Sequence, residues 1–292
     1  MAEAATGARP DWLRVRVAAG PNYRQVRELG QSLALHTVCE EARCPNIFDC
    51  WERRTATFMI LGDTCTRACR YCAVQTGWPG FVDWEEPERV AEAVAQLGLR
   101  HAVVTCVTRD DIPDGGAAVF AATVRAIRRR SPGTSVEVLT SDFLGRMESV
   151  RTVMEARPDI FNHNIETVRR LHPEVRLKGG YERSLAVLAE AHRLAPEIPT
   201  KSGLMVGLGE SFEEIEATMR DLLAVGVSIL TVGQYLRPSS SKRHVPVARY
   251  YRPEEFGRLK ERALELGFRV VEAGPFVRSS YHADQQVARL RG

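Results

Sequence analysis

Several features that would place this 292-residue sequence in a special class are missing from it. It has no apolar run long enough to cross a membrane and no signal-like segment in its first twenty residues, so we expect a cytoplasmic protein that does not bind membranes. It has no large excess of charge, because 40 basic and 37 acidic residues leave a net charge of +3. Aromatic residues are few, at 7%, and are not interleaved with basic ones, which argues against a nucleic-acid-binding protein. Without repeats or low-complexity tracts, the composition is typical of a packed globular chain.

Cysteine is also scarce, and its seven positions are unevenly distributed. Six of them form two compact triplets, namely Cys39, Cys44 and Cys50, then Cys65, Cys69 and Cys72. Cysteines in the cytoplasm are kept reduced, so this spacing favours metal binding or catalysis over disulfides. A cubane iron–sulfur cluster has four irons, so each triplet leaves one iron for a ligand other than cysteine. Cys106 stands apart and is interpreted as a small buried hydrophobic residue.

From residue 56 onward, short apolar runs alternate with stretches of helical periodicity, which predicts six βα units on a parallel sheet. The predicted strands are 56–61, 102–106, 135–140, 160–164, 201–207 and 228–234, and the predicted helices are 87–97, 117–130, 145–156, 181–194, 211–225 and 253–266. Six units are fewer than the eight of a closed barrel, so we expect an α/β fold with a partial (β/α)6 TIM-type barrel at 56–267. A doubly wound sheet is the alternative. Extensions at 1–55 and 268–292 are expected to cover the barrel opening.

The second triplet forms a C-x3-C-x2-C run directly after the first predicted strand. This arrangement resembles the radical S-adenosylmethionine superfamily, in which such a run holds a 4Fe-4S cluster. The resemblance implies that Cys65, Cys69 and Cys72 bind three irons and that the fourth iron binds the methionine part of S-adenosylmethionine. Reductive cleavage of that cofactor then gives a 5′-deoxyadenosyl radical, which removes hydrogen from an unactivated carbon. Zinc is the alternative, although a structural zinc site normally needs four protein ligands.

The same resemblance suggests which residues contact S-adenosylmethionine. They are an aromatic residue between the last two cysteines, an acidic and glycine-rich segment after the second strand, and polar residues at the fourth and fifth strands. These candidates are Tyr71, Asp110, Gly115, Gly116, Asn164, Glu166, Lys201 and Ser202. Each has a structural alternative, because loops, tight turns and helix ends use the same residue types.

The first triplet and the closing Arg278-Ser279-Ser280-Tyr281 segment extend the resemblance to the lipoyl synthase family, over nearly the whole chain. The family's auxiliary 4Fe-4S cluster implies Cys39, Cys44, Cys50 and Ser280 as its ligands here. Arg278 is expected to orient or gate the serine, and the second triplet, Ser280 and Arg278 are the implied catalytic residues. A serine oxygen matches iron less well than a thiolate, so this cluster is expected to be labile. An ordinary C-terminal loop is the alternative interpretation of the serine segment.

The implied reaction inserts sulfur at C6 and C8 of an octanoyl group bound to a lysine of a lipoyl carrier domain. It runs through two rounds of hydrogen abstraction, and the auxiliary cluster supplies both sulfur atoms. The implied partners are octanoylated domains of 2-oxoacid dehydrogenase E2 subunits and the glycine cleavage H protein. An electron donor such as flavodoxin or ferredoxin and an iron–sulfur carrier for cluster repair are implied as well.

Three other functions fit parts of the same pattern. The first is another two-cluster radical enzyme, such as a methylthiotransferase or a biotin synthase-like sulfur inserter. The second is a non-catalytic iron–sulfur electron carrier, and the third is a zinc-stabilised binding module. The spacing of the first triplet, together with the terminal serine motif, favours lipoyl synthase.

Three further segments of the sequence each allow two interpretations. The polar stretch 239–244 is either a flexible connection or a functional segment, namely a lid or partner contact. Trp78 and Trp84 either shield the cluster or pack beneath a loop. Four arginines near the end of the second helix are interpreted as a solvated last turn in preference to a docking patch. These are Arg125, Arg128, Arg129 and Arg130.

Overall fold

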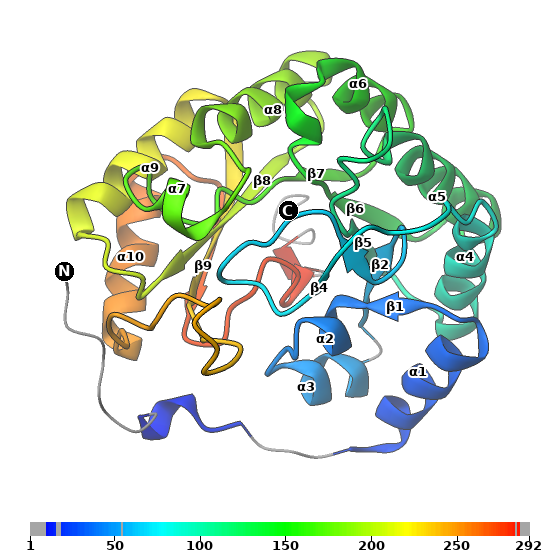
Figure 1. The fold of residues 1–292 in the computed structure, drawn as a ribbon, viewed down its shortest axis with the longest axis horizontal. Coiled ribbons are helices and arrows are strands. Elements are labelled where there is room, and N and C mark those ends of the chain that lie inside the picture. The colour runs from blue at the N-terminus through cyan, green and yellow to red at the C-terminus, as the bar shows by residue number, and fades with distance from the viewer. Residues whose placement is uncertain (1–9, 16–18, 54, 284, 287–292) are drawn as a thin grey trace.

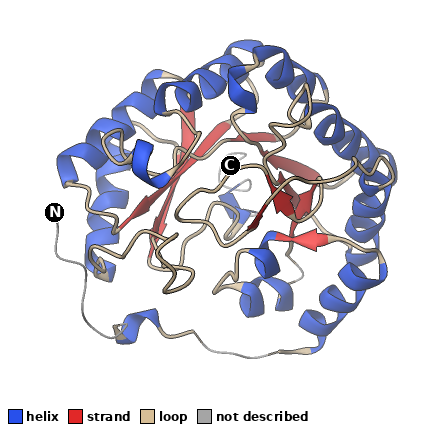
Figure 2. Cartoon of the chain, viewed as in Figure 1, coloured by secondary structure: helices blue, strands red, loops and turns tan. Residues whose placement is uncertain are grey.

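The computed structural model describes residues 10–15, 19–53, 55–283 and 285–286. Its centre is an eight-stranded sheet with the order β1-β2-β5-β6-β7-β8-β9-β10. The sheet curves into an open barrel with helices outside it (Figures 1 and 2). Its strands are β1 (His36–Thr37), β2 (Thr57–Ile60), β5 (His101–Cys106), β6 (Ser135–Leu139), β7 (Ile160–Asn162), β8 (Thr200–Val206), β9 (Val227–Gln234) and β10 (Val270–Gly274). A separate small ladder joins β3 (Thr64–Cys65) to β4 (Gln75–Thr76).

The helices follow the strands in the order that the periodicity predicts. The outer layer consists of α4 (Glu86–Leu97), α5 (Ala117–Arg130), α6 (Met147–Glu155), α8 (Tyr181–Leu194), α9 (Phe212–Ala224) and α10 (Pro253–Leu266). The remaining elements are α1 (Pro21–Ser32), α2 (Val38–Glu41), α3 (Ile47–Glu52), α7 (His172–Val175) and the 3₁₀ turns η1 (Asp11–Leu13) and η2 (Phe143–Gly145). Among the described residues, no helix combines the length and the apolar character that crossing a bilayer requires.

The partial barrel is confirmed, and each of the six predicted strands and six predicted helices lies within two residues of its expected bounds. From β2 to β10 all pairings are parallel, and the strands follow one another in chain order. A doubly wound sheet would reverse its strand order at a switch point. The topology is therefore that of a barrel in which β1 and β10 form the two edges.

One parallel strand, β10, was not predicted. It lies beyond residue 267, inside the expected C-terminal extension. It pairs with β9 from Val270 and Ile229 to Gly274 and Gly233. Only its first two residues are buried, so it lacks the continuous apolar run that marks the other strands. The strand leads the chain from the outer wall toward the barrel opening.

The two extensions meet at this opening. Helices α2 and α3 lie in the gap between the two edges of the sheet (Figure 1). The amide of Asn46 donates a hydrogen bond of 2.7 Å to the carbonyl of Phe276 and so ties the N-terminal extension to the C-terminal one. Behind it, Trp51 is fully buried, and its ring packs on Tyr23 at 5.1 Å. The segments that carry the first triplet and the terminal serines are thereby held side by side.

Candidate functional site

A cavity of about 650 Å³ lies at the carboxyl ends of the strands. Its wall includes residues from β5, β6, β8 and β9, from the loop that follows β2, and from both extensions. Cys39 and Cys44 of the first triplet line it, and so do all three cysteines of the second. In a partial barrel this end of the sheet is where ligands bind. The two triplets, which the sequence places on separate segments, therefore face one space.

The first triplet is built on α2, the turn after it, and α3. A left-handed residue, Arg43 (φ 50°), turns the chain back so that the amide of Cys44 donates to the carbonyl of Cys39 at 3.0 Å. Burial raises the pKa of Cys39 to about 12 and also raises the pKa values of Cys44 and Cys50. Repulsion from Cys39 and Cys44 adds to the shift at Cys50, so the three sulfurs are mutual neighbours. Cys50 packs against the hydrophobic core and does not line the cavity.

The second triplet lies on a compact loop after β2. The backbone turns at Leu61 (φ 70°) and Gly62 (φ 87°). Cys65 belongs to β3, and its carbonyl accepts a hydrogen bond of 3.0 Å from the amide of Gly77. Burial raises the pKa of Cys69 to about 11 and that of Cys72 to about 12. The loop therefore holds three sulfurs close together in a water-poor environment.

Both triplets fit a cubane cluster better than a single metal ion. In the described part of the chain, no group of three or more Cys, His, Asp or Glu side chains converges as one metal ion requires. A structural zinc ion needs four ligands around one point, whereas each thiolate of a cubane binds a different iron. Burial makes the thiolate forms costly unless positive charge lies beside them, and iron supplies that charge.

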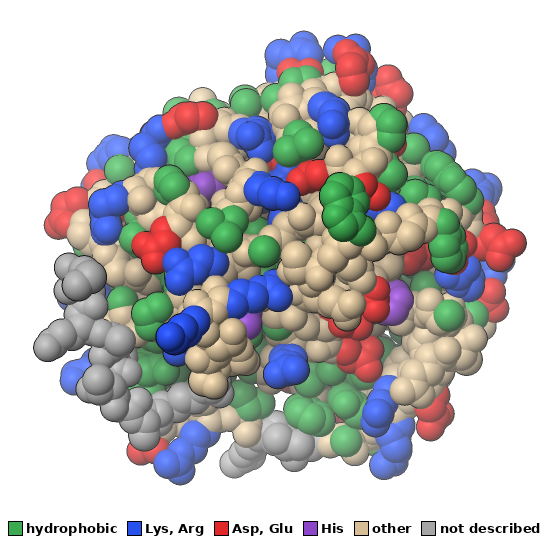
Figure 3. All heavy atoms as spheres, viewed as in Figure 1, with side chains coloured by type: hydrophobic (Ala, Val, Ile, Leu, Met, Phe, Trp, Pro, Cys, Tyr) green, Lys and Arg blue, Asp and Glu red, His purple; other side chains and the backbone are tan. Residues whose placement is uncertain are grey.

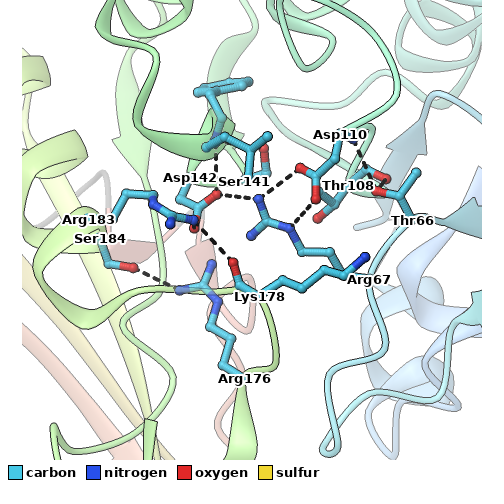
Figure 4. Close-up of polar contacts among 12 residues, drawn as sticks. Thr66, Arg67, Thr108, Asp110, Ser141, Asp142, Arg176, Lys178, Arg183 and Ser184 are labelled. Atoms are coloured by element: carbon cyan, nitrogen blue, oxygen red, sulfur yellow. Dashed lines mark hydrogen bonds and ion pairs between the residues drawn. The ribbon is translucent and has the colours of Figure 1, made fainter. Parts of the chain in front are cut away.

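The loop of the second triplet is anchored by Arg67, which lies between Cys65 and Cys69 in the sequence. Figure 4 shows the polar contacts of this arginine. Arg67 is only 3% exposed, and its guanidinium bonds both carboxylate oxygens of Asp110 at 2.8 Å. It also donates to Asp142 at 2.6 Å, which holds the pKa of Asp142 below its usual range although burial opposes this. Thr66 adds a backbone bond of 3.0 Å to Thr108. The loop is therefore fixed to the chain that follows β5 and β6.

This anchor leads to a prediction for Arg67→Lys. Lysine keeps the charge but cannot bond two carboxylates through a planar fork, so we expect a stability loss of about 1–3 kcal/mol. We also expect less iron to be retained by the anaerobically reconstituted protein. Chemical denaturation and iron assays test both effects. Arg193→Lys is the matched control, since Arg193 makes an exposed pair with Glu190, and an equal loss in both variants would contradict the prediction.

Three of the predicted S-adenosylmethionine contacts do line the cavity, namely Tyr71, Asn164 and Glu166. Burial raises the pKa of Glu166, while Arg176 and hydrogen bonds from Asn164 and Tyr71 oppose the shift. The Oδ1 atom of Asn164 is buried and has no hydrogen-bond partner among the described residues. Glu166 adopts a left-handed conformation (φ 71°), which is uncommon outside glycine and is often found at functional sites. This wall thus offers a free acceptor and a carboxylate next to the second triplet.

The other five predicted contacts do not line the cavity, and the structure assigns them structural roles. Asp110 bonds Arg67, and the hydroxyl of Ser202 donates to the carbonyl of His163 at 2.9 Å. The ammonium of Lys201 bonds Glu137 at 2.9 and 3.0 Å, and both side chains are fully buried. Direct contact of Asp110, Gly115, Gly116, Lys201 and Ser202 with S-adenosylmethionine therefore stays a prediction.

The glycine pair has a steric role in the fold. Gly115 and Gly116 have φ values of 63° and 92° and form the tight turn that enters α5. A Cβ atom on Gly116 would lie 2.2 Å from the side chain of Leu61. Glycine is therefore needed here so that the turn can pack against the start of the second-triplet loop.

The terminal serine segment reaches the cavity through a close backbone passage beside β9. A Cβ atom on Gly233 would lie 2.1 Å from the carbonyl oxygen of Val277, so only glycine allows this approach. Arg278, Ser279 and Ser280 then line the cavity together with Cys39 and Cys44. Arg278 is close enough to Cys44 for their charges to interact. The structure thus brings the serine motif to the first triplet, and the hydrogen bond that joins the two extensions, from Asn46 to Phe276, spans 230 residues of sequence.

The tryptophans that follow the second triplet neither cover the cavity nor pack beneath a loop. Trp78 is 84% exposed and Trp84 is 62% exposed, and neither lines the cavity.

Cys106 is partly buried in the cavity wall. Burial raises its pKa to about 12, as suits a small hydrophobic residue.

The sequence analysis did not identify Arg67 and Arg176 as residues of the site. The only signal for either in the sequence is the position of Arg67 inside the cysteine motif.

Comparisons with known proteins agree with this geometry. Residues 59–222 match the family model of the radical SAM superfamily, and residues 3–44 match that of the N-terminal domain of lipoyl synthase. The chain is 62% identical to the lipoyl synthase of Rubrobacter xylanophilus over 97% of its own length and 88% of the relative. It is 61% identical to the lipoyl synthase of a Geobacillus species over 96% of its length and 93% of the relative.

Solved structures show a similar fold at low sequence identity. Methylornithine synthase superposes with a TM-score of 0.54 at 13% identity and covers 90% of this chain and 87% of its own. SuiB of Streptococcus suis bound to S-adenosylmethionine gives 0.57 at 12% identity, over 86% of this chain and 60% of its own. Fold, cysteine arrangement and sequence similarity over the full length agree, and the chain belongs to the lipoyl synthase family of the radical S-adenosylmethionine superfamily.

Proposed function

We propose that the shared cavity is where this chain inserts two sulfur atoms, at C6 and C8 of an octanoyl group on a lysine of a lipoyl domain. Membership of the lipoyl synthase family makes the chain a sulfur-inserting enzyme that uses S-adenosylmethionine and two 4Fe-4S clusters and acts on a lipoyl-domain substrate. One observation carries the placement of the reaction: cysteines of both triplets line the same cavity. We propose that an eight-carbon arm in this cavity reaches both.

The proposed ligand sets follow the two triplets. Cys65, Cys69 and Cys72 hold the cluster that binds S-adenosylmethionine, and Cys39, Cys44, Cys50 and Ser280 hold the auxiliary cluster. When bound, these groups supply the radical chemistry and the sulfur, and the protein supplies position and exclusion of water. Arg278 is the proposed positioning residue for Ser280, since both line the cavity and the charge of Arg278 interacts with that of Cys44.

The polar wall is the proposed contact surface for S-adenosylmethionine. The unpartnered Oδ1 atom of Asn164 can accept a hydrogen bond from an amino or hydroxyl group. Glu166 offers a carboxylate to ribose hydroxyls, and the ring of Tyr71 offers an apolar face to adenine. Tyr71 and Glu166 lie close enough to Cys69 for their charges to interact.

The remaining wall suits an aliphatic arm. Met59, Val107, Leu139, Leu204 and Met205 line the cavity with apolar side chains. A radical on carbon needs to be kept from water and from side reactions, and an apolar wall around an extended chain provides this. The cavity thus has a polar wall beside the second triplet and an apolar path for the substrate.

A cavity glycine provides a test of the polar wall. In Gly203→Ala the new Cβ atom would lie 2.6 Å from Oδ1 of Asn164 and 3.0 Å from Oγ1 of Thr231. We expect the dissociation constant of S-adenosylmethionine to rise about tenfold, which corresponds to about 1.4 kcal/mol, with the iron content unchanged. Calorimetric titration measures this. Gly30→Ala is the control because a Cβ there meets no atom within 4 Å, and unchanged affinity in Gly203→Ala would contradict the assignment.

Further partners and the location of the protein are part of the proposal. The family's reaction needs an octanoylated acceptor, for which we propose E2 subunits of 2-oxoacid dehydrogenases and the glycine cleavage H protein. It also needs electrons and renewal of a consumed cluster, for which we propose flavodoxin or ferredoxin and an iron–sulfur carrier. All of these place the enzyme in the cytoplasm.

The decisive experiment incubates anaerobic, reconstituted protein with octanoylated carrier domain, S-adenosylmethionine and a reductant. Mass spectrometry is expected to find a product with two added sulfurs, together with 5′-deoxyadenosine. About eight irons per chain are expected from two four-iron clusters. A methylthio product would indicate a different two-cluster enzyme, absence of 5′-deoxyadenosine an electron carrier, and zinc in place of iron a binding module.

A further inference from the structure

The loop that follows β9 is attached directly to the loop of the second triplet. His244 bonds the carbonyl of Cys72 at 3.0 Å, and the amide of Val245 donates to the carbonyl of Arg70 at 3.1 Å. Arg243 donates to the hydroxyl of Thr76 at 2.7 Å. The sequence left stretch 239–244 open between a flexible connection and a lid or partner contact. These bonds attach it to the site.

This loop carries positive charge that the neighbouring residues do not neutralise. We define the basic rim as Arg237, Lys242 and Arg243. The nearby Arg70 pairs with Glu174, but for these three the described part of the chain offers no carboxylate within ion-pair distance. Arg237 and Arg243 donate instead to carbonyl and hydroxyl oxygens. Figure 3 shows several Lys and Arg side chains on this face, over the loop that follows β9.

The arginines at the end of α5, unlike those of the basic rim, pair with carboxylates of the chain. Arg128 pairs with Asp159, and Arg129 and Arg130 pair with carboxylates of α4. That cluster therefore has its own neutralising partners within the fold, which supports its interpretation as a solvated helix end. The positive charge of the basic rim therefore remains available to a partner molecule.

The rim lies where a substrate arm must pass. Tyr235, Leu236, Arg237 and Pro238 line the cavity, and the chain continues from them directly into the exposed residues Ser240 to Lys242. If the proposed function holds, the octanoyl group enters on a lysine side chain, and the folded domain that carries it stays outside. Because the arm is covalent and short, that domain must touch the residues around the opening.

On the basis of the proposed function, we propose that the basic rim is the docking surface for an acidic face of the lipoyl carrier domain. Uncompensated cations at an opening attract a partner of opposite charge, raise the association rate and set its orientation. An electron donor needs only proximity to the second triplet and does not insert an arm, so the rim's continuity with the cavity wall favours the carrier. The contact acts on substrate capture and leaves the chemical step unchanged.

The test removes rim charge at positions without an anchoring role. Lys242 and Ser240 are exposed, and neither side chain has a hydrogen bond to any of the described residues. The double variant Lys242→Glu/Ser240→Glu lowers the rim charge by three. The control, Arg125→Glu/Gln96→Glu, makes the same change on the exposed outer surface of α5 and α4. Both are compared with the unchanged chain on an octanoylated carrier domain and on a short neutral octanoyl-lysine peptide.

We expect the rim variant to raise KM for the carrier domain by roughly tenfold at low salt, with kcat unchanged. The effect should shrink at high salt, and KM for the peptide should not change. The dissociation constant of the carrier domain, measured without turnover, should rise in parallel. Because this measurement needs no sulfur insertion, it separates failure of the docking proposal from failure of the proposed function.

Two results would overturn the proposal. One is equal affinity of the rim variant and the control for the carrier domain at low salt. The other is a rim variant that binds the carrier normally but turns over slowly with reduced flavodoxin and at full rate with dithionite. That outcome would assign the surface to the electron donor.

Discussion

Cys44→Ala is expected to abolish sulfur insertion while S-adenosylmethionine is still cleaved. Cys44 belongs to the first triplet and lies beside Arg278, whereas the second triplet is held separately by Arg67 and the β3–β4 ladder. Loss of a thiolate from the first triplet removes the proposed sulfur source without disturbing that anchor. Chromatography of 5′-deoxyadenosine and mass spectrometry of the carrier domain measure the two activities on one sample.

The matching change in the second triplet, Cys69→Ala, should reduce both activities to the level without enzyme. Each variant should retain about four irons per chain, as one four-iron cluster requires. Cys106→Ala is the control, because Cys106 lines the same cavity but belongs to neither triplet, and it should keep both activities. Equal loss of both activities in Cys44→Ala would contradict the division of roles between the triplets.

The fold was predictable wherever a segment shows the hydrophobic periodicity of a strand or a helix in its own sequence. Buried strands such as β5 and amphipathic helices such as α8 show their periodicity in the sequence alone. Strand β10 does not, because three of its five residues are partly exposed and its position depends on pairing with β9. The cysteine triplets were predictable for the same reason as the helices, since their spacing is local.

The partners of the polar site residues within the protein were not predictable, because they depend on the three-dimensional fold. Asp110, a predicted cofactor contact, bonds Arg67, 43 residues away in the sequence. Lys201, another predicted contact, bonds Glu137, 64 residues away. Neither ion pair is visible from the sequence, and contact of these two residues with the cofactor stays a prediction.

Lys201→Met is expected to destabilise the protein by about 3–5 kcal/mol, because it leaves the carboxylate of Glu137 buried without its cation. Both side chains have no exposed surface, and Asn162 also donates to Glu137 at 2.7 Å. Burial raises the pKa of Glu137, but Lys201 and His101 outweigh burial and lower it to about 2. The ionised carboxylate therefore stabilises the fold above its ordinary pKa, and this contribution is lost as the pH falls toward 2.

The double variant Glu137→Gln/Lys201→Met separates this structural role from a role in binding. It removes both charges and keeps an acceptor for Asn162, so it should recover part of the loss, with a coupling energy of about 0.5–3 kcal/mol. Its stability should also depend less on pH on the acid side. Denaturation of the anaerobic protein across a pH series measures both quantities. If Lys201 contacted S-adenosylmethionine instead, Lys201→Met would weaken binding of the cofactor at unchanged stability, and the double variant would recover nothing.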